Sequence, residues 1–299
     1  PDDLIRDADT AMYRAKEKGR DRAEMFDDRL RAQAVRRHSV EQELRSALGN
    51  ERIEVHFQPV VRIADGVVVG AEALARVRDE NGDLLHPAQF IDVAEDSGLV
   101  AELGAEVLNL SLNRLAAWGK NNDQQLTMAV NVSARQLADP AFPNLVSSAL
   151  KTNKLEPIQV ALEFTESALI AANPVTERVL GDLTNLGVRI GLDDFGTGFS
   201  SLAYLKRLPI DFLKIDRSFV SGLNSDDDDT AIVEGTIALA HSLGLQVVAE
   251  GVETEAQLRQ LQKLQCDLAQ GFHFSEPVTD AEFDRFLNHS WSPSPISSN

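Results

Sequence analysis

Six short apolar segments of this 299-residue chain each carry, at or near the carboxyl end, side chains suited to divalent-metal chemistry. These side chains are Glu72, Asn131, Glu163, Asp193 with Asp194, Lys214 with Asp216, and Glu250. A β-strand normally ends in a turn former such as Gly, Pro or Ser. Carboxylates gathered in one place repel one another unless cations lie between them. The pattern therefore indicates metal-dependent chemistry on an anionic substrate.

The segment LDDFGTGFSS at 192–201 carries two adjacent carboxylates, Asp193 and Asp194. In two-metal sites, carboxylates hold ions about 4 Å apart that clamp the attacking and leaving oxygens of a phosphodiester. Gly196 and Gly198 permit a tight, mobile loop beside such a site. An acidic turn is the alternative for this segment taken alone. The five other strand ends favour the metal site.

The remaining oxygen ligands suit a hard cation. Glu72, Asn131 and Glu163 offer carboxylate and amide oxygens, which Mg²⁺ and Mn²⁺ prefer. The six histidines are scattered and the chain has one cysteine, so zinc-like spacing is absent from the sequence. We expect two ions of Mg²⁺ or Mn²⁺.

Lys214 and Glu250 are the candidates for handling the reacting water. Alternation along a strand places Lys214 and Asp216 on one face, so the lysine either holds the water and stabilises negative charge, or forms a structural ion pair with Asp216. Glu250 is placed to act as general base, or as ligand to a second ion. Glu253, in the same loop, either supports the site or begins a helix.

Alternating strand and helix patterns predict the scaffold from Arg52 onward. The expected strands are 53–57, 67–75, 127–131, 158–164, 188–192, 211–215, 246–249 and 268–274. The expected helices are 88–97, 104–118, 143–153, 173–186, 199–206, 230–243, 254–264 and 280–287. Eight such units predict an α/β fold, a modified (β/α)8 TIM-like barrel. The short IADG connection between the first two strands indicates an antiparallel first strand.

Composition limits the classes of partner. The chain is 43% hydrophobic and 25% charged, with a net charge of −18. Long nucleic acid is excluded because it requires a basic footprint. No apolar run approaches the roughly 20 residues that span a bilayer. The single cysteine, Cys266, excludes an internal disulfide and suits a reducing compartment, so we expect a cytoplasmic domain, with any membrane anchor elsewhere in the parent protein.

Several long motifs resemble those of the EAL-domain phosphodiesterases. They are EALAR (72–76), NVSARQL (131–137), LEFTES (162–167), DDFGTGFSSLAYLKRLPIDFLKIDRSFV (193–220), AEGVET (249–254) and QGFHFSEP (270–277). The resemblance implies a bacterial signalling enzyme that hydrolyses cyclic di-GMP to 5′-pGpG with Mg²⁺ or Mn²⁺, and for which Ca²⁺ is inhibitory. It also implies a homodimer.

The resemblance assigns roles to individual positions. Metal ligands would be Glu72, Asn131, Glu163, Asp193, Asp194 and Glu250, while Lys214 and Glu250 would position and activate the water. The ligand would be bordered by Gln58, Arg76, Asp216 and Gln270. Glu166 would brace the loop 195–201, including Phe195, Gly196, Thr197 and Gly198, which in this family couples dimerisation to metal binding. Departures from the family pattern are Val77, Asp92 and Phe272, and Val77 could weaken packing near the substrate.

The start of the chain resembles a different domain. ADTAMYRAKEKGRDR (8–22) is similar to the end of a GGDEF diguanylate cyclase domain. We therefore expect a GGDEF remnant at 1–27, a helical linker at 28–49, an EAL barrel at 50–290 and a disordered tail at 291–299. The parent protein would carry upstream GGDEF and sensor domains.

Two alternatives to the enzyme remain open. The chain could be a cyclic di-GMP receptor that binds without turnover, although degenerate relatives lose ligands that this chain retains. It could also be an enolase-type barrel with a lysine base acting on a carboxylate substrate. Adjacent aspartates with Asn131 fit two metals better than the one metal of that alternative.

Overall fold

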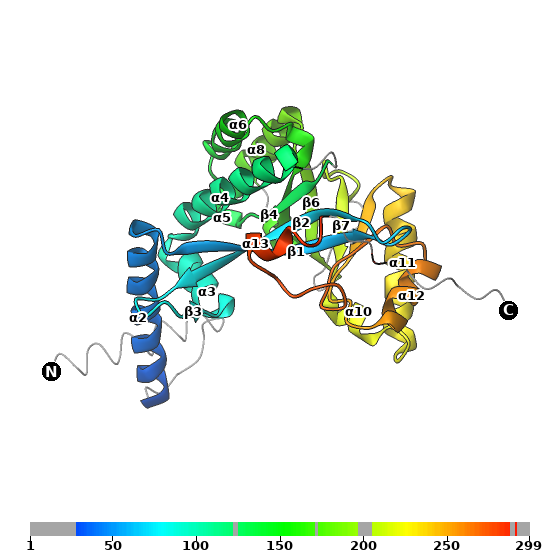
Figure 1. The fold of residues 1–299 in the computed structure, drawn as a ribbon, viewed down its shortest axis with the longest axis horizontal. Coiled ribbons are helices and arrows are strands. Elements are labelled where there is room, and N and C mark those ends of the chain that lie inside the picture. The colour runs from blue at the N-terminus through cyan, green and yellow to red at the C-terminus, as the bar shows by residue number, and fades with distance from the viewer. Residues whose placement is uncertain (1–27, 122–124, 171–172, 197–204, 288–290, 292–299) are drawn as a thin grey trace. The chain divides into compact units, whose positions relative to one another are not determined.

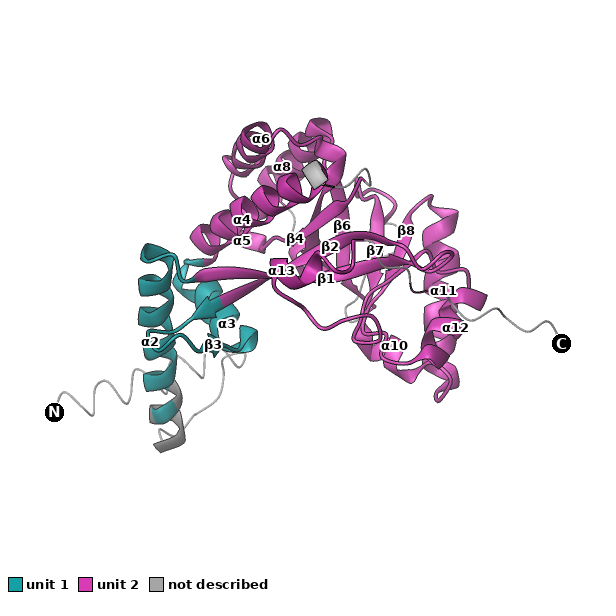
Figure 2. Cartoon of the chain, in the orientation of Figure 1, with its two compact units in different colours: residues 1–52, 77–99 teal, residues 53–76, 100–299 magenta. Residues whose placement is uncertain are grey.

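The computed structural model describes residues 28–121, 125–170, 173–196, 205–287 and 291 (Figure 1). The expected GGDEF remnant at 1–27 lies outside these residues, as does the expected tail apart from Trp291. The chain divides into two compact units, residues 1–52 with 77–99 and residues 53–76 with 100–299 (Figure 2). The second unit holds all the strand ends that carry candidate site residues.

Eight strands form a closed ring. They are β1 (Ile53–Arg62), β2 (Val68–Arg78), β4 (Thr127–Asn131), β5 (Val160–Thr165), β6 (Arg189–Phe195), β7 (Phe212–Ile215), β8 (Gln246–Ala249) and β9 (Leu268–Ala269). Their order is β1-β9-β8-β7-β6-β5-β4-β2, and β1 pairs with β2 to close the ring. The strands from β2 through β9 run parallel, while β1 is antiparallel to β9. The predicted modified barrel with an antiparallel first strand is confirmed.

Strand register aligns the candidate site residues at one end of the barrel. Asn131 on β4 lies beside Glu163 on β5, and Thr165 lies beside Asp193 on β6. Because side chains two residues apart share a face, the same strands also send apolar residues into the interior. One such cluster joins Ala129, Ala161, Phe212, Val248 and Leu268. The sheet thus buries an apolar layer beneath the polar ends of its strands.

Helices follow most of the strands. The longer ones in the second unit are α4 (Val100–Asn121), α6 (Phe142–Asn153), α8 (Pro174–Leu186), α11 (Asp227–Ser242) and α12 (Glu255–Lys263). The acidic run before α11 acts as a cap, since Asp226 accepts hydrogen bonds from the backbone N–H of Asp228 and Asp229 at 2.8 and 3.2 Å. None of the helices in the described part of the chain is long and apolar enough to cross a membrane.

Short helices interrupt several loops at the site-bearing end and were not predicted. They are α5 (Ala134–Leu137), α7 (Glu166–Ile170) and α10 (Arg217–Gly222). A 3-10 turn at Pro157–Gln159 precedes β5, at the opposite end of that strand. A sequence signal existed for α5: Ser133 and Gln136 have capping-box spacing, and the two side chains do cap each other's backbone N–H. The expected helix 199–206 falls mostly outside the described residues.

Several predicted boundaries were wrong: for example, α4 begins at Val100 where 104 was expected, and β6 continues to Phe195 where 192 was expected. β1 continues to Arg62, where the expected strand stopped at 57, because Val61 and Arg62 pair with Ala269 and Leu268 of β9. The strand expected at 268–274 stops at Ala269, because Phe274 N donates to Gly271 O and the chain turns. Helix α13 (Asp280–Phe283) is shorter than the expected 280–287, and the chain then tightens into turns in which Phe286 N donates to Phe283 O.

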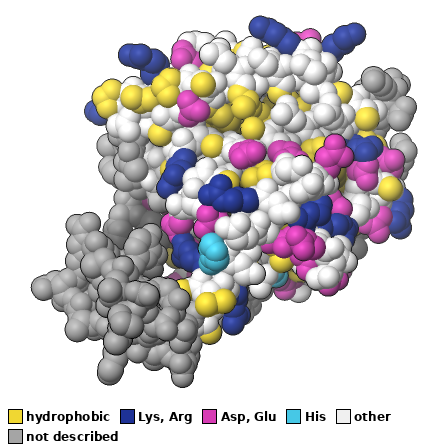
Figure 3. Space-filling model, turned by 90° about the vertical axis from the view of Figure 1, so that its left-hand side faces the viewer, with side chains coloured by type: hydrophobic (Ala, Val, Ile, Leu, Met, Phe, Trp, Pro, Cys, Tyr) yellow, Lys and Arg dark blue, Asp and Glu magenta, His cyan; other side chains and the backbone are white. Residues whose placement is uncertain are grey.

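Despite the net charge of −18, the acidic side chains do not cover every face of the molecule uniformly. On the face shown in Figure 3, acidic and basic side chains are interspersed with apolar ones. Mixed surface charge of this kind favours solubility and offers no basic track for a polyanion. Cys266 is buried, and burial raises the pKa of its thiol to about 12, so this cysteine is a structural residue.

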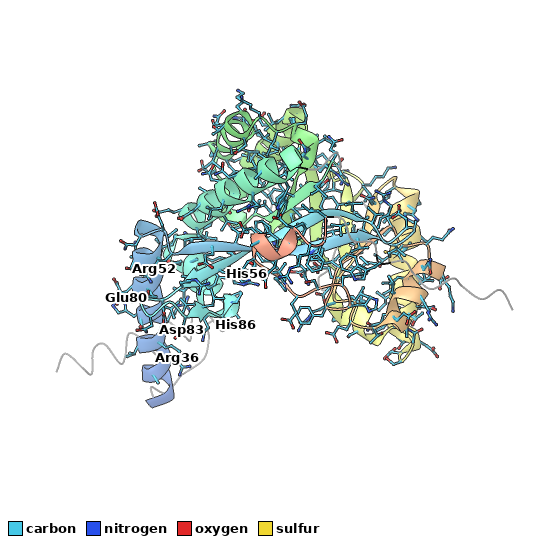
Figure 4. The ribbon with its side chains drawn as sticks, viewed as in Figure 1. Arg36, Arg52, His56, Glu80, Asp83 and His86 are labelled. Atoms are coloured by element: carbon cyan, nitrogen blue, oxygen red, sulfur yellow. The ribbon has the colours of Figure 1, made fainter. Side chains whose placement is uncertain are left out.

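The first unit contains α2 (Asp28–Gly49), α3 (Pro87–Ser97) and the two-residue strand β3 (Leu84–Leu85), which pairs with the end of β2. The helical structure predicted for 28–49 is confirmed. Arg52, labelled in Figure 4, pairs with Glu43 of α2 and donates to Arg78 O at 2.7 Å. Val77 has no exposed surface and lies opposite Leu85, so its side chain is not available to a ligand.

Candidate active site

Lys214 on β7 lies at the centre of the predicted carboxylate group. Its side chain is 1% exposed, and its Nζ contacts carboxylates from four other strands or strand ends. The distances are 2.7 Å to Glu250, 2.8 Å to Glu163, 3.3 Å to Glu72 and 3.4 Å to Asp193. The barrel therefore gathers side chains that are up to 178 residues apart in sequence, from Glu72 to Glu250.

The alternative ion pair between Lys214 and Asp216 does not form. Asp216 instead caps α10, where its side chain accepts a hydrogen bond from Ser218 N at 2.9 Å. The alternation that placed both residues on one face holds only within the strand, and β7 ends at Ile215. Asp216 still lies close enough to Asp194 for its charge to act on that carboxyl group.

Glu72 is held by neutral donors as well as by Lys214. Asn131 Nδ2 donates to Glu72 Oε1 at 2.6 Å, and Gln270 Nε2 donates to Glu72 Oε2 at 2.6 Å. The same Gln270 amide donates to Gln58 Oε1 at 2.8 Å, and Gln58 donates to Ser275 O at 3.0 Å. Burial opposes ionisation, but the charge of Lys214 and these hydrogen bonds lower the pKa of Glu72. Glu72 is therefore a fixed anion.

The pKa values of Glu163 and Glu250 are shifted in the opposite direction to that of Glu72. Burial is the main cause that raises the pKa of Glu163 well above its ordinary value, and the charges of Glu72 and Asp193 add to it. Burial, with Asp193 and Glu72, raises the pKa of Glu250 to about 8 despite the contact with Lys214. The ammonium group opposes its own burial, yet the surrounding carboxylates raise the pKa of Lys214 well above its ordinary value. The single positive charge of Lys214 is thus too small to neutralise the carboxylates around it.

Asp193, Asp194 and Glu250 lie close enough together to hold a divalent cation. Within the described residues, one oxygen from each of the three lies within 4.8 Å of the others. Asp194 has a left-handed backbone with φ of 55°, and its N–H donates to Asp193 Oδ1 at 2.9 Å. Burial, followed by the charges of Asp193 and Asp216, raises the pKa of Asp194. The donors are all hard oxygens and carry excess negative charge, so they fit Mg²⁺ or Mn²⁺.

The remaining predicted residues fall into three groups. Gln58 and Gln270 join the central network, as described. Arg76 is half-buried and donates to Ala75 O at 2.9 Å, and within the described chain it shares no ion pair with the carboxylate group. Glu253 is exposed, and it lines the cavity beside Glu250.

The loop residues expected beside the site are described only in part. Glu166 is buried, and its Oε2 accepts a hydrogen bond from Gly196 N at 3.4 Å. Glu166 Oε1 is buried and has no hydrogen-bond partner among the described residues. Phe195 ends β6, while Thr197 and Gly198 lie outside the described residues.

A cavity of about 250 Å³ opens onto Glu72 and Glu250 of this carboxylate group. Its lining includes Gln58, Glu72, Glu250 and Gln270, together with Leu74, Arg217, Gly251, Glu253, Gly271 and Phe272. The sequence interpretation missed Leu74 and Arg217 as lining residues. Both lie within motifs quoted from the sequence, Leu74 in 72–76 and Arg217 in 193–220, but an apolar residue and an arginine carry no metal-ligand signal of their own.

The raised pKa of Glu250 predicts how metal-free stability depends on pH. Its pKa is about 8 in the fold against an ordinary 4.5. Between these values the folded state holds a proton that the unfolded state has lost. The free energy of unfolding should therefore fall as the pH rises from about 5 to 8. Urea unfolding with a chelator at pH 5.5, 7.0 and 8.5 measures this slope. Glu250→Gln should flatten it, and an equally steep slope in that variant contradicts the assignment.

Comparison with known proteins places this geometry in a family. The sequence profile described as EAL domain matches residues 41–277. The chain belongs to the EAL-domain family. Its EAL domain matches the solved PaMucR phosphodiesterase in complex with c-di-GMP with a TM-score of 0.78 and 40% identity, covering 82% of this chain and 99% of that one.

Two curated relatives come from Pseudomonas aeruginosa. The bifunctional diguanylate cyclase/cyclic di-GMP phosphodiesterase MucR is 40% identical over 276 residues, which is 92% of this chain and 40% of MucR. The cyclic di-GMP phosphodiesterase NbdA is 40% identical over 286 residues, which is 96% of this chain and 36% of NbdA. This chain thus spans less than half the length of each of these two relatives.

Proposed function

We propose that this chain hydrolyses cyclic di-GMP to the linear dinucleotide 5′-pGpG. One observation carries the proposal: carboxylates from separate strand ends converge on a single buried lysine beside an open cavity. Relatives of about 40% identity are named as phosphodiesterases for this substrate. The adjacent Asp193 and Asp194 with Glu250 are suited to cations that would neutralise a phosphodiester.

The roles that we assign to the site residues follow from their charges and pKa shifts. We assign Glu72, Asn131, Glu163, Asp193, Asp194 and Glu250 to holding two divalent ions, Mg²⁺ or Mn²⁺. When bound, such ions polarise the phosphoryl oxygens and lower the pKa of water. Glu250, with its raised pKa, accepts the proton of the attacking water. Lys214 orients that water and stabilises negative charge in the transition state.

Further residues would contact the substrate, and a further segment would link the catalytic domain to the rest of the full-length protein. Gln58, Arg76, Asp216 and Gln270 would border the dinucleotide, and Glu166 with Glu253 would support the surrounding loops. Residues 50–290 would form the catalytic domain and 28–49 a linker from an upstream GGDEF domain. A homodimer, inhibition by Ca²⁺ and a cytoplasmic location also remain predictions.

The direct test is product analysis with purified protein, cyclic di-GMP and Mg²⁺ or Mn²⁺. We expect 5′-pGpG as the product. Glu250→Gln should slow turnover by at least about 10²-fold, the lower range for general-base catalysis, while the dissociation constant for the dinucleotide in Ca²⁺ changes little. Glu234→Gln, on the exposed surface of α11, is the matched control and should retain the wild-type rate. Tight binding without turnover at any metal concentration would support the receptor alternative.

A further inference from the structure

A second cavity, of about 220 Å³, lies inside the barrel at the end opposite to the candidate active site. Its mouth is formed by residues at the amino ends of the parallel strands and at the last residue of the antiparallel β1, namely Arg62, Gln125, Arg189 and Gln246. Its inner end reaches Glu163 and Gln270, which are 3% and 4% exposed. The barrel is therefore hollow between this mouth and the carboxylate group.

The cavity exists because small residues occupy positions where a barrel usually carries bulky ones. The interior of a TIM-like barrel is normally filled by layers of side chains rich in Val, Ile and Leu. Here Gly70, Ala129 and Ala161, on the adjacent strands β2, β4 and β5, line the cavity and extend no more than a methyl group into it. Apolar space left empty in a core destabilises a protein in proportion to its volume. A cavity of about 150 Å³ with apolar walls is enough to bind benzene, so this one has room for a small organic molecule.

One cationic group at the mouth of this cavity lacks an anionic partner. Arg189 is half-buried, its Nη2 donates to Gln246 Oε1 at 2.9 Å, and its guanidinium lies 5.2 Å from the centre of the Phe212 ring. It forms no ion pair within the part of the chain that the structure describes, although the charge of Asp211 acts on it. A guanidinium carries five N–H donors in a planar fork that matches a carboxylate. Arg189 therefore retains donors for an anionic group at the mouth.

The other polar groups of the cavity decide how such a ligand lies. Arg62 is paired with Asp65 at 2.9 Å, so its charge is already compensated. A second carboxylate beside Glu163 would be repelled, which leaves the mouth at Arg189 as the place for an anion. Gln270 Oε1 is buried and has no hydrogen-bond partner among the described residues, so the inner end holds an acceptor that a hydroxyl group of a ligand can satisfy.

We propose that this cavity binds a small organic monocarboxylate with an aromatic body, its carboxylate held by Arg189 and a hydroxyl group at its far end facing Gln270. The aromatic body fills the empty space against Ala129, Ala161 and Phe212, whose side chains are apolar and buried. This site is separate from the cavity that opens onto Glu250, and the proposal does not depend on the hydrolysis of cyclic di-GMP.

The test titrates the full chain, in chelator, with 4-hydroxyphenylacetate and with 4-hydroxyphenylacetamide, which has nearly the same shape and no charge. Chelator prevents the carboxylate from binding through a metal ion at the other end of the barrel. Methyl NMR shifts of Val69 and Val248, which line the cavity, report binding at this place. We expect the acetate to bind with a dissociation constant of about 0.1–1 mM, which is ordinary for a ligand of this size. The acetamide should bind at least about tenfold more weakly, because it lacks a hydrogen bond between charged groups.

Two variants and a control locate the site. Arg189→Gln should weaken binding of the acetate at least about tenfold and leave the affinity for the acetamide unchanged. Arg178→Gln, on the exposed surface of α8, should change neither affinity. Ala161→Leu fills the cavity and should abolish binding of both ligands, with the circular dichroism spectrum of wild type.

Three outcomes overturn the proposal. They are methyl shifts that stay constant up to about 10 mM acetate, equal affinities of wild type for the acetate and the acetamide, and an Ala161→Leu protein that binds as wild type does. If Ala161→Leu does not fold, the comparison of the two ligands in Arg189→Gln decides, since a loss that is equal for both ligands contradicts the pairing of Arg189 with a carboxylate.

Discussion

Glu72→Ala should abolish turnover of cyclic di-GMP, with a fall in kcat of at least about 10³-fold. The expected size follows from losing a charged metal ligand, because metal stabilisation of transition-state charge amounts to several kcal/mol. The substitution also removes the two carboxylate oxygens that accept from Asn131 Nδ2 and from Gln270 Nε2, each at 2.6 Å. Asp193→Asn should have a similar effect, since it keeps the shape of the side chain and removes its charge.

Steady-state kinetics at saturating Mg²⁺ or Mn²⁺ measure this effect. Glu234→Ala, an exposed glutamate on α11, controls for the general loss of an acidic side chain. Circular dichroism spectra must match between variant and wild type, so that lost activity reports on the site. A Glu72→Ala protein with the wild-type rate contradicts both the metal role of Glu72 and the proposed mechanism.

Lys214→Met should strongly destabilise the metal-free protein. Among the residues that the structure describes, Lys214 is the one cation in contact with Glu72, Glu163, Asp193 and Glu250, and its side chain is 1% exposed. Removing one partner from a buried ion pair typically destabilises a protein by about 3–5 kcal/mol, because the remaining charges stay desolvated. The loss should be greater at pH 8.5 than at pH 6, where proton uptake by the carboxylates relieves the repulsion.

Urea unfolding with and without Mn²⁺ measures the loss and its recovery. Mn²⁺ should offset part of the destabilisation, because it returns positive charge to the same oxygens. Lys263→Met, on the exposed surface of α12, should stay within about 0.5 kcal/mol of wild type. An unfolding free energy for metal-free Lys214→Met equal to that of wild type would show that Lys214 does not neutralise this cluster.

Much of the barrel could be predicted because its signals are local. The β-branched runs that end in Glu163 and Asp193 carry both the strand pattern and the polar residue at the strand end. Closing the ring then brings these ends together for any sequence of this architecture. The convergence of the carboxylates on one pocket therefore followed from the fold class, before any side-chain position was known.

The partners of individual side chains were less predictable. Lys214 and Asp216 are two residues apart, so a local ion pair was a reasonable alternative. Because β7 ends at Ile215, Asp216 lies outside the strand and caps the N-terminus of α10. The early end of β9 at Ala269 depends on the contact of Gly271 with Val252, which no short window of sequence contains. Such details come from tertiary contacts and not from local propensity.

The antiparallel first strand has a consequence for how the site is assembled. Gln58 on β1 is hydrogen-bonded to Gln270 and to Ser275 O, and the latter bond spans 217 residues. Pairings this distant in sequence form late in folding, because a long loop must first be closed. During synthesis the ribosome must release almost the entire domain before these amides can meet. Incomplete chains and proteolytic fragments that lack the last strand should therefore be inert, and catalytic competence should appear as a single late event.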